Sequence, residues 1–196
     1  MKRNTNSSNK TRRLVLIGAL GGISIFLGIS VLGLIRLPIF SLTIMHIPVI
    51  IGALLEGPIV GIAVGLIFGL FSMYQNITAP GLTSFIFWNP IIALIPRILI
   101  GVISYYSFKL LKHKIKNTGI CVGISAILGT LTNTVGVLGL TYILYLDRYA
   151  QAREISREAV AGTLLTVGLT NGVPEAIVSA LITVPIVVTM LKSKRK

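Results

Sequence analysis

The residue whose chemistry stands out is Arg97, because it lies inside an apolar stretch. That stretch runs from Ser84 to Lys112 and is long and apolar enough to cross a bilayer. A guanidinium inside such a span is costly and rarely faces lipid, so we expect Arg97 to face a protein interior or a wet cavity and to have a partner there. The alternative is an arginine that extends to the membrane interface or only ties two helices together.

A depth estimate identifies the predicted partner of Arg97. Counting about 1.5 Å of helical rise per residue from the basic end of each apolar segment, Arg97 lies about 18 Å above Lys109 and Glu175 lies about 25 Å above Lys192. The hydrocarbon core is ~30 Å thick, so both fall in the half away from the basic ends. They are the only opposite charges expected at neighbouring depths, and each is therefore the predicted partner of the other in the empty protein.

Other polar and aromatic residues fall in or near the same outer half. Asn89, Asn133 and Asn171 each offer a donor and an acceptor, which suits a ligand with amide and hydroxyl groups. Each also suits a helix cap or an interhelical hydrogen bond. His46, near mid-depth, is better explained as a packing residue. With Trp88 and Arg36 near the outer interface, where tryptophan often lies, the candidate substrate-binding residues are Arg97, Glu175, Asn133, Asn89, Asn171, Trp88, His46 and Arg36.

Composition predicts the elements that position these residues. The 196-residue chain is 54% hydrophobic and 12% charged, and its mean hydropathy is +0.89. Such a composition is typical of a single domain of membrane helices. The apolar segments lie at about Leu14–Ile35, Ile39–Leu55, Ile59–Tyr74, Phe85–Phe108, Ile120–Leu146 and Gly172–Leu191.

The distribution of charge predicts the topology. A net charge of +13 would suggest nucleic acid in a soluble protein, but here the basic residues form blocks at the N-terminus, at Lys109–Lys116 and at Lys192–Lys196. Six crossings bring all three blocks to one side, which the positive-inside rule makes cytoplasmic. We therefore predict an all-α integral membrane protein with six transmembrane helices, both termini cytoplasmic and no nucleic-acid partner. Residues 1–13 and 192–196 are predicted as basic tails, and residues 14–191 as one membrane domain.

The last external connection is predicted to run from Asp147 to Asn171. Its first part mixes charge signs and is typical of an amphipathic helix lying over the outer mouth. Asn171 and Pro174 favour a helix break before the last span, because asparagine caps helices and proline is tolerated in a first turn. Together these features predict a pocket that is open to the outside and closed below.

Two glycine series predict close helix contacts. One is Gly18-x-x-x-Gly22, beside Ala19, in the first segment. The other is Gly61-x-x-x-Gly65-x-x-x-Gly69 in the third segment. For the third segment we expect packing inside the protein, whereas for the first a partner protein and internal packing are equally open.

Several motifs of catalytic chemistry are missing from the sequence. It contains no G-x-x-x-x-G-K-[ST] and no H-E-x-x-H, so we expect neither ATP hydrolysis nor a catalytic metal, and no cofactor. The single cysteine, Cys121, rules out an internal disulfide and is predicted to be a packing residue. No pair of carboxylates lies at one depth, as an intramembrane aspartic protease would require. The chain is therefore predicted not to be an enzyme.

Five stretches carry a resemblance to a known family. They are M-H-I-P-V-I-I-G-A-L-L-E-G-P at Met45–Pro58, G-L-I-F-G-L-F-S at Gly65–Ser72, I-P-R-I-L-I-G at Ile95–Gly101, G-T-L-T-N-T-V-G-V-L-G at Gly129–Gly139 and T-N-G-V-P-E-A at Thr170–Ala176. In this order they resemble the substrate-binding S component of energy-coupling factor (ECF) vitamin transporters, most closely its pantothenate-type branch. The likeness extends from Arg12 to Lys192.

The resemblance implies a function and partners. Such a subunit captures a vitamin from outside, here pantothenate first and folate or another vitamin second, and joins a transmembrane coupling subunit and two ATPases. It is expected to topple in the plasma membrane of a bacterium. Family members commonly dock through an Ala-x-x-x-Ala face of the first helix, for which this chain offers Gly18, Ala19 and Gly22. A stand-alone secondary carrier or membrane enzyme is the alternative from another class.

Overall fold

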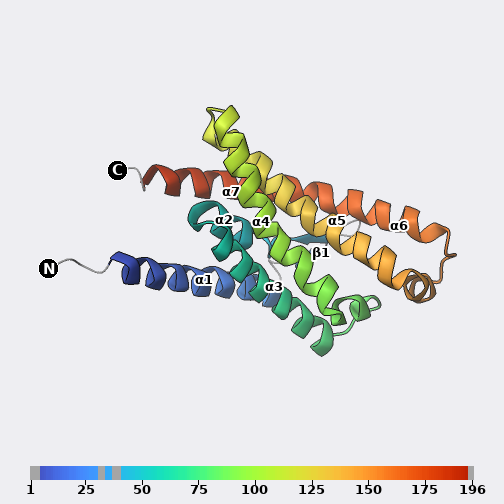
Figure 1. Ribbon diagram of the computed structural model, residues 1–196. Helices are drawn as coiled ribbons and strands as arrows, with labels where there is room; N and C mark the ends of the chain where they lie inside the picture. Colours follow the sequence, from blue (N-terminus) through green and yellow to red (C-terminus); the bar gives the residue numbers. More distant parts are fainter. Residues whose placement is uncertain (1–4, 31–33, 37–40, 194–196) are drawn as a thin grey trace.

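A computed structural model describes residues 5–30, 34–36 and 41–193, without the side chains of residues 5–9, 34–36 and 41–42. The chain forms a bundle of helices with one short antiparallel strand pair (Figure 1). In chain order the elements are α1 (Thr5–Ile29), β1 (Leu34–Arg36), β2 (Ser41–Thr43), α2 (Ile47–Glu56), α3 (Pro58–Thr78), η1 (Ser84–Trp88), α4 (Pro90–Lys114), α5 (Thr118–Arg153), α6 (Ala159–Val167), η2 (Gly168–Gly172) and α7 (Val173–Ser193).

The predicted helical membrane class is confirmed. Within the described residues, α1, α3, α4, α5 and the combined α6–η2–α7 rod are each long and apolar enough to cross a bilayer. In the second predicted span, the described helix α2 begins only at Ile47 and has ten residues. Its length of about 15 Å covers half of a ~30 Å hydrocarbon core. At its far end, Glu56 lies 2.6 Å from Arg12 of α1, so the chain still returns to the side on which α1 begins.

The strand pair was not predicted from the sequence. Leu34 pairs with Thr43 and Arg36 with Ser41, so the first apolar segment leaves the helix at Ile29 and continues as a strand. Pairing gives the backbone groups of these residues partners that a non-helical chain would otherwise lack. The pair joins α1 to the segment before α2.

The last external connection is shorter than predicted. Residues 147–153 are helical, as expected, but they continue α5 beyond a kink at Tyr145, where φ is −133°. Figure 1 shows this last turn of α5 almost end-on. The helix break predicted at Asn171–Pro174 is instead the π-helix η2, which joins α6 to α7. One wide turn accommodates Pro174, which has no N–H for an α-helical bond.

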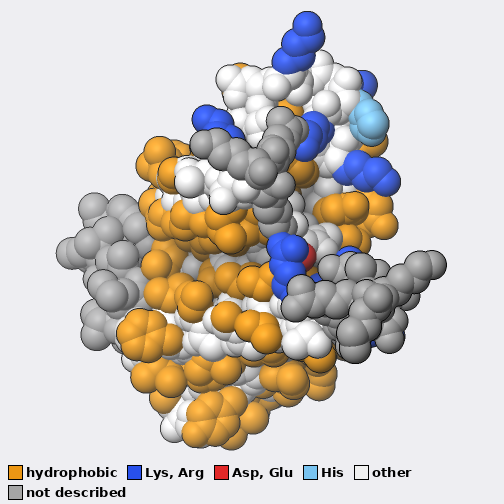
Figure 2. Space-filling view, turned by 90° about the vertical axis from the view of Figure 1, so that its left-hand side faces the viewer, with side chains coloured by type: hydrophobic (Ala, Val, Ile, Leu, Met, Phe, Trp, Pro, Cys, Tyr) orange, Lys and Arg blue, Asp and Glu red, His pale blue; other side chains and the backbone are white. Residues whose placement is uncertain are grey.

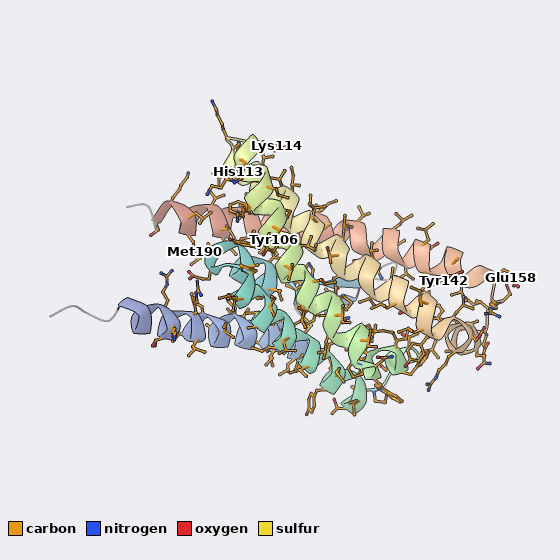
Figure 3. The ribbon with its side chains drawn as sticks, viewed as in Figure 1. Tyr106, His113, Lys114, Tyr142, Glu158 and Met190 are labelled. Atoms are coloured by element: carbon orange, nitrogen blue, oxygen red, sulfur yellow. The ribbon has the colours of Figure 1, made fainter. Side chains whose placement is uncertain are left out.

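The described residues of the three basic blocks lie toward one end of the bundle. The start of α1, the α4–α5 turn and the end of α7 lie in the left-hand part of Figure 1, and the α5–α6 turn lies at the opposite end. Figure 2, viewed from the first end, shows lysines and arginines among hydrophobic side chains. In Figure 3, Lys114 lies at the upper left, at the α4–α5 turn, and Glu158 lies at the far right, before α6. This arrangement is the one expected of a chain that crosses the membrane six times.

A close crossing of α3 and α4 positions the centre of the bundle. Gly61, Gly65 and Gly69, which we call the α3 glycine seam, lie against the α4 backbone. A β-carbon on Gly69 would lie 2.6 Å from the carbonyl oxygen of Ala93, and one on Gly65 would clash with the carbonyl of Arg97. The seam therefore confirms the predicted internal packing of the third segment and fixes the position of Arg97.

Candidate substrate-binding site

A cavity of about 440 Å³ opens in the half of the bundle away from the basic end. Its walls come from α3, η1, α4, α5, the α6–η2–α7 rod and the end of β2. The α3–η1 turn contributes Ala79, Gly81 and Ser84, which places the mouth opposite the α4–α5 turn. Four predicted site residues lie together on these walls: Arg97, Asn133, Asn171 and Glu175.

Arg97 owes its orientation to the proline before it. In a regular helix the carbonyl of Ile92 would accept the N–H of residue 96, but Pro96 has none to donate. The Nη1 group of Arg97 donates to this carbonyl instead, at 2.7 Å. The Pro96-Arg97 pair thus turns the guanidinium back along α4 and satisfies a carbonyl that the proline leaves open.

Two aromatic rings cover the Arg97 guanidinium. Its Cζ lies 4.9 Å from the ring centre of Phe87 and 5.5 Å from that of Phe68, distances at which the ring faces attract a cation. Arg97 is buried, and its Nε has no hydrogen-bond partner among the described residues. The site therefore holds a desolvated cation with donor capacity still available on the cavity wall.

The predicted partner of Arg97 makes a different contact. The Oε1 atom of Glu175, a buried residue in the first turn of α7, accepts the backbone N–H of Thr43 at 2.7 Å. Among the described residues, the ion pairs within 4.0 Å are Arg12–Glu56 and Arg157–Asp147. Arg97 and Glu175 thus share the cavity without an ion pair, and Glu175 ties β2 to α7.

The asparagines separate into two groups. Asn133 and Asn171 line the cavity, and the buried Oδ1 of Asn133 has no partner among the described residues. Asn89 lies outside the lining and caps α4, because its Oδ1 accepts the N–H of Ile91 at 3.0 Å. Its Nδ2 lies 3.4 Å from the hydroxyl of Tyr145.

Three further predicted residues are not brought to the cavity by described contacts. Trp88 is 47% exposed and donates its Nε1–H to the carbonyl of Asn76. His46 is fully buried, with its Nε2 3.0 Å from the Oγ1 of Thr130. Arg36 lies in β1, and its side chain is outside the described part of the chain.

One face of α3 contributes residues that the sequence analysis did not single out. Phe68, Ser72 and Gln75 follow each other at helical spacing and all line the cavity, as does Phe87 of η1. The spacing of four and three residues was visible in the sequence and places them on one helix face. Their partner across the cavity was not visible, because it depends on how α3 crosses α4.

The predicted docking residues lie on the outside of α1. Gly18, Ala19 and Gly22 are exposed, and a β-carbon on either glycine would meet no atom within 4 Å. Gly21, between them, faces inward, where its β-carbon would lie 2.7 Å from Ile67. The first glycine series is therefore not used for packing inside the described bundle.

Comparison with known proteins agrees with this architecture. The family of ECF transporter substrate-specific components matches residues 12–187. The chain belongs to this family. It is accordingly a multi-pass protein of the plasma membrane and a component of a transport system. No group of three or more His, Cys, Asp or Glu residues able to hold a metal ion occurs in the part of the chain that the structure describes.

Two relatives of this ECF component carry names that state a substrate. The chain is 31% identical over 166 residues to the pantothenic acid transporter PanT of Lactococcus lactis subsp. cremoris, which covers 78% of this chain and 79% of the relative. It is 33% identical over 182 residues to the pantothenate transporter PanT of Leuconostoc mesenteroides subsp. mesenteroides, covering 87% and 88%.

Proposed function

We propose that this ECF component captures pantothenate from outside the cell through the cavity at Arg97. The names of its two relatives support this substrate. The observation that carries the proposal is the Arg97 guanidinium, which is buried on the cavity wall beneath two aromatic rings and has no carboxylate of the described residues within 4.0 Å. The cavity of about 440 Å³ falls within the range usual for small-molecule sites.

Pantothenate matches the polar groups of the cavity. Its carboxylate would pair with Arg97, which presents planar donors suited to a two-oxygen anion. Its amide and hydroxyls would meet Asn133 and Asn171, each with donor and acceptor atoms. The Oδ1 of Asn133 is already buried without a protein partner, so a ligand donor there would satisfy it at no further desolvation cost.

Energy for uptake would come from partner subunits. The sequence has no G-x-x-x-x-G-K-[ST] motif for nucleotide binding, so we infer no catalytic role for this chain and assign ATP hydrolysis to two ATPases joined through a transmembrane coupling subunit. The open face of α1 at Gly18, Ala19 and Gly22 is the proposed docking surface, because small residues allow a partner helix to approach closely.

The orientation proposed from the basic clusters has its own test. A cysteine in place of Lys114 should resist a membrane-impermeant thiol reagent on intact cells, whereas one in place of Ala79 should react. Both positions are exposed, and the natural Cys121 is fully buried. Equal labelling at the two positions would contradict the proposed orientation.

The substrate role of Arg97 is tested by its substitution. A charge-assisted pair of this kind contributes about 1.5–3 kcal/mol, so Arg97→Ala should weaken pantothenate binding by roughly ten- to a hundredfold. Arg97→Lys keeps the charge but loses the planar fork and should recover only part of the affinity. Isothermal titration of the purified protein measures the effect, and Arg153→Ala, at an exposed arginine outside the cavity, is the control. Folate, offered as a competitor, tests the second vitamin.

A double mutant separates binding from structure. If Arg97 served only to balance Glu175, Arg97→Gln combined with Glu175→Gln would restore both folding and near-normal affinity. If Arg97 binds the substrate carboxylate, the double mutant should fold and still bind poorly. A well-folded Arg97→Ala protein with unchanged affinity would refute the proposed role of Arg97.

A further inference from the structure

A second hollow lies on the outside of the bundle, between α5 and the α6–η2–α7 rod. We call it the lateral groove. It has a volume of about 440 Å³, and its lining includes Val135, Gly139 and Tyr142 of α5 and Leu165 and Leu169 of the facing rod. These apolar side chains are largely exposed: Val135 is 68% and Leu165 65% accessible. The groove therefore opens onto the surface of a membrane-embedded bundle, where lipid chains are the solvent.

The length of the lateral groove matches one leaflet. Its lining on α5 runs from Leu131 to Tyr142, a rise of about 16 Å. Half of a ~30 Å hydrocarbon core is nearly the same length. Tyr142 lies toward the α5–α6 turn in Figure 3, so the groove runs from that interface to mid-membrane. An extended acyl chain of that leaflet has the length and the polarity to fill it.

A basic hollow adjoins the interfacial end of the lateral groove. Tyr142 lines both the lateral groove and this basic hollow, and the basic hollow is also lined by Asp147, Arg148 and Arg157. The Nε of Arg157 lies 3.2 Å from Asp147, but both side chains are 68% exposed, and an exposed pair of this kind contributes little. A lipid phosphate can therefore compete for Arg157. Two arginines and one carboxylate line the hollow itself, and Glu158, next in the chain, also interacts electrostatically with Arg157.

The lateral groove and the substrate cavity share a wall. Thr134 and Leu138 line both. A β-carbon on Gly168 would lie 3.0 Å from a methyl group of Leu138, so the rod packs closely against this wall beside the groove. A chain held in the groove would support the outer side of the wall that the cavity uses.

We propose that the lateral groove is a phospholipid site, which holds one acyl chain of an anionic lipid with its phosphate at Arg157. Lipid chains are as apolar as the groove, so the affinity comes from packing and from the headgroup rather than from water exclusion. The competing occupant is a helix of a partner protein.

Native mass spectrometry of the full chain tests the site. The purified protein is titrated with phosphatidylglycerol or phosphatidylcholine carrying palmitoyl and oleoyl chains. Gly139→Phe fills the groove where a β-carbon meets nothing within 4 Å, and it should abolish retention of the first lipid molecule. Gly162→Phe is the matched control, because Gly162 is equally open but outside the groove.

Arg157→Gln should remove the preference for phosphatidylglycerol, and Arg153→Gln should keep it.

A second measurement does not depend on the filled variant. With Trp88→Phe as background, the protein has a single tryptophan at Tyr142→Trp, which replaces one aromatic ring of the groove lining with another, or at Leu181→Trp on α7, where the leucine is 69% exposed. In phosphatidylcholine vesicles containing a small fraction of brominated phosphatidylglycerol, the groove tryptophan should be quenched beyond the bulk fraction and the α7 tryptophan should not. Equal quenching at both positions would overturn the proposal. Equal lipid retention by the Gly139→Phe and Gly162→Phe proteins would also overturn it. So would loss of the groove quenching when partner subunits are added, because a partner helix would then be the occupant.

Discussion

The two glycine series of this chain share a spacing and have opposite surroundings. In the α3 glycine seam, a β-carbon on Gly61 would lie 2.6 Å from the Cβ of Ala53 and 2.9 Å from the Cα of Gly101. In α1, a β-carbon on Gly18 or Gly22 would meet nothing within 4 Å. The spacing alone indicates that another helix can approach closely. The surroundings determine whether that helix comes from the same chain or from a partner protein.

The difference suggests a division of labour between the two helices. The α3 seam draws in the α4 backbone and holds Arg97, which the proposed substrate site needs. The α1 face leaves its glycines open, which the proposed docking of a coupling subunit needs. Each assignment predicts a different consequence when a glycine acquires a side chain.

The largest effect is expected at Gly65. A β-carbon there would clash with the carbonyl of Arg97, and a backbone group cannot rotate away as a side chain end can. Gly65→Val should therefore destabilise the protein by about 3 kcal/mol, the upper end of overpacking costs, and should abolish pantothenate binding by displacing α4. Thermal unfolding in detergent and isothermal titration measure the two effects. Gly22→Val is the matched control, and an equal loss in both variants would contradict the comparison.

A smaller effect, and a partial rescue, are expected at Gly61. Gly61→Ala should cost about 2 kcal/mol, because its β-carbon overlaps that of Ala53 and approaches Gly101. Removing the facing methyl group with Ala53→Gly should recover about 1 kcal/mol of this in a double-mutant cycle. Chemical denaturation of the three variants measures the coupling. Strict additivity of the two substitutions would show that the contact with Ala53 does not limit the crossing.

The sequence predicted the helical membrane class and much of the cavity, because both depend on local signals. Arg97, Asn133, Asn171 and Glu175 gather on one cavity, since helical rise gives the depth of a residue to within several Å when helices are modestly tilted. The partners of Arg97 were not predictable in the same way. Depth does not specify direction around a helix, so it did not show that the hydrogen bond of Glu175 goes to Thr43 and that its charge acts on Arg97 only from beyond 4.0 Å.

The parts that sequence reasoning missed depend on contacts distant in the chain. The strand pair at Leu34–Arg36 and Ser41–Thr43 lies in segments that read as continuous apolar spans. The wall formed by Phe68 and Phe87 depends on the angle at which α3 meets η1 and α4. By contrast, the carbonyl that Pro96 leaves open for Arg97 was a local signal present in the sequence, in the order Ile92, Pro96, Arg97.

The smallest effect on the isolated chain is expected at Gly18, although the effect on assembly should be complete. Gly18 is exposed and a β-carbon there has open space, so Gly18→Leu should change the free energy of unfolding by less than about 0.5 kcal/mol. It should also leave pantothenate affinity unchanged, because the cavity lies in the other half of the bundle. A leucine would nonetheless hold a partner helix away from α1, so the variant should no longer co-purify with the coupling subunit and ATPases.

Gly162→Leu is the control for this loss, because Gly162 is equally open but lies on α6, away from α1. It should assemble normally. Assembly of Gly18→Leu at the level of the unsubstituted chain would show that the partner docks elsewhere. If Gly18→Leu lost both pantothenate binding and stability, the glycines of α1 would instead serve packing inside the protein, as those of α3 do. Either result would contradict the assignment of α3 to internal packing and α1 to docking. The assignment requires that Gly18→Leu loses assembly while folding and pantothenate binding stay intact.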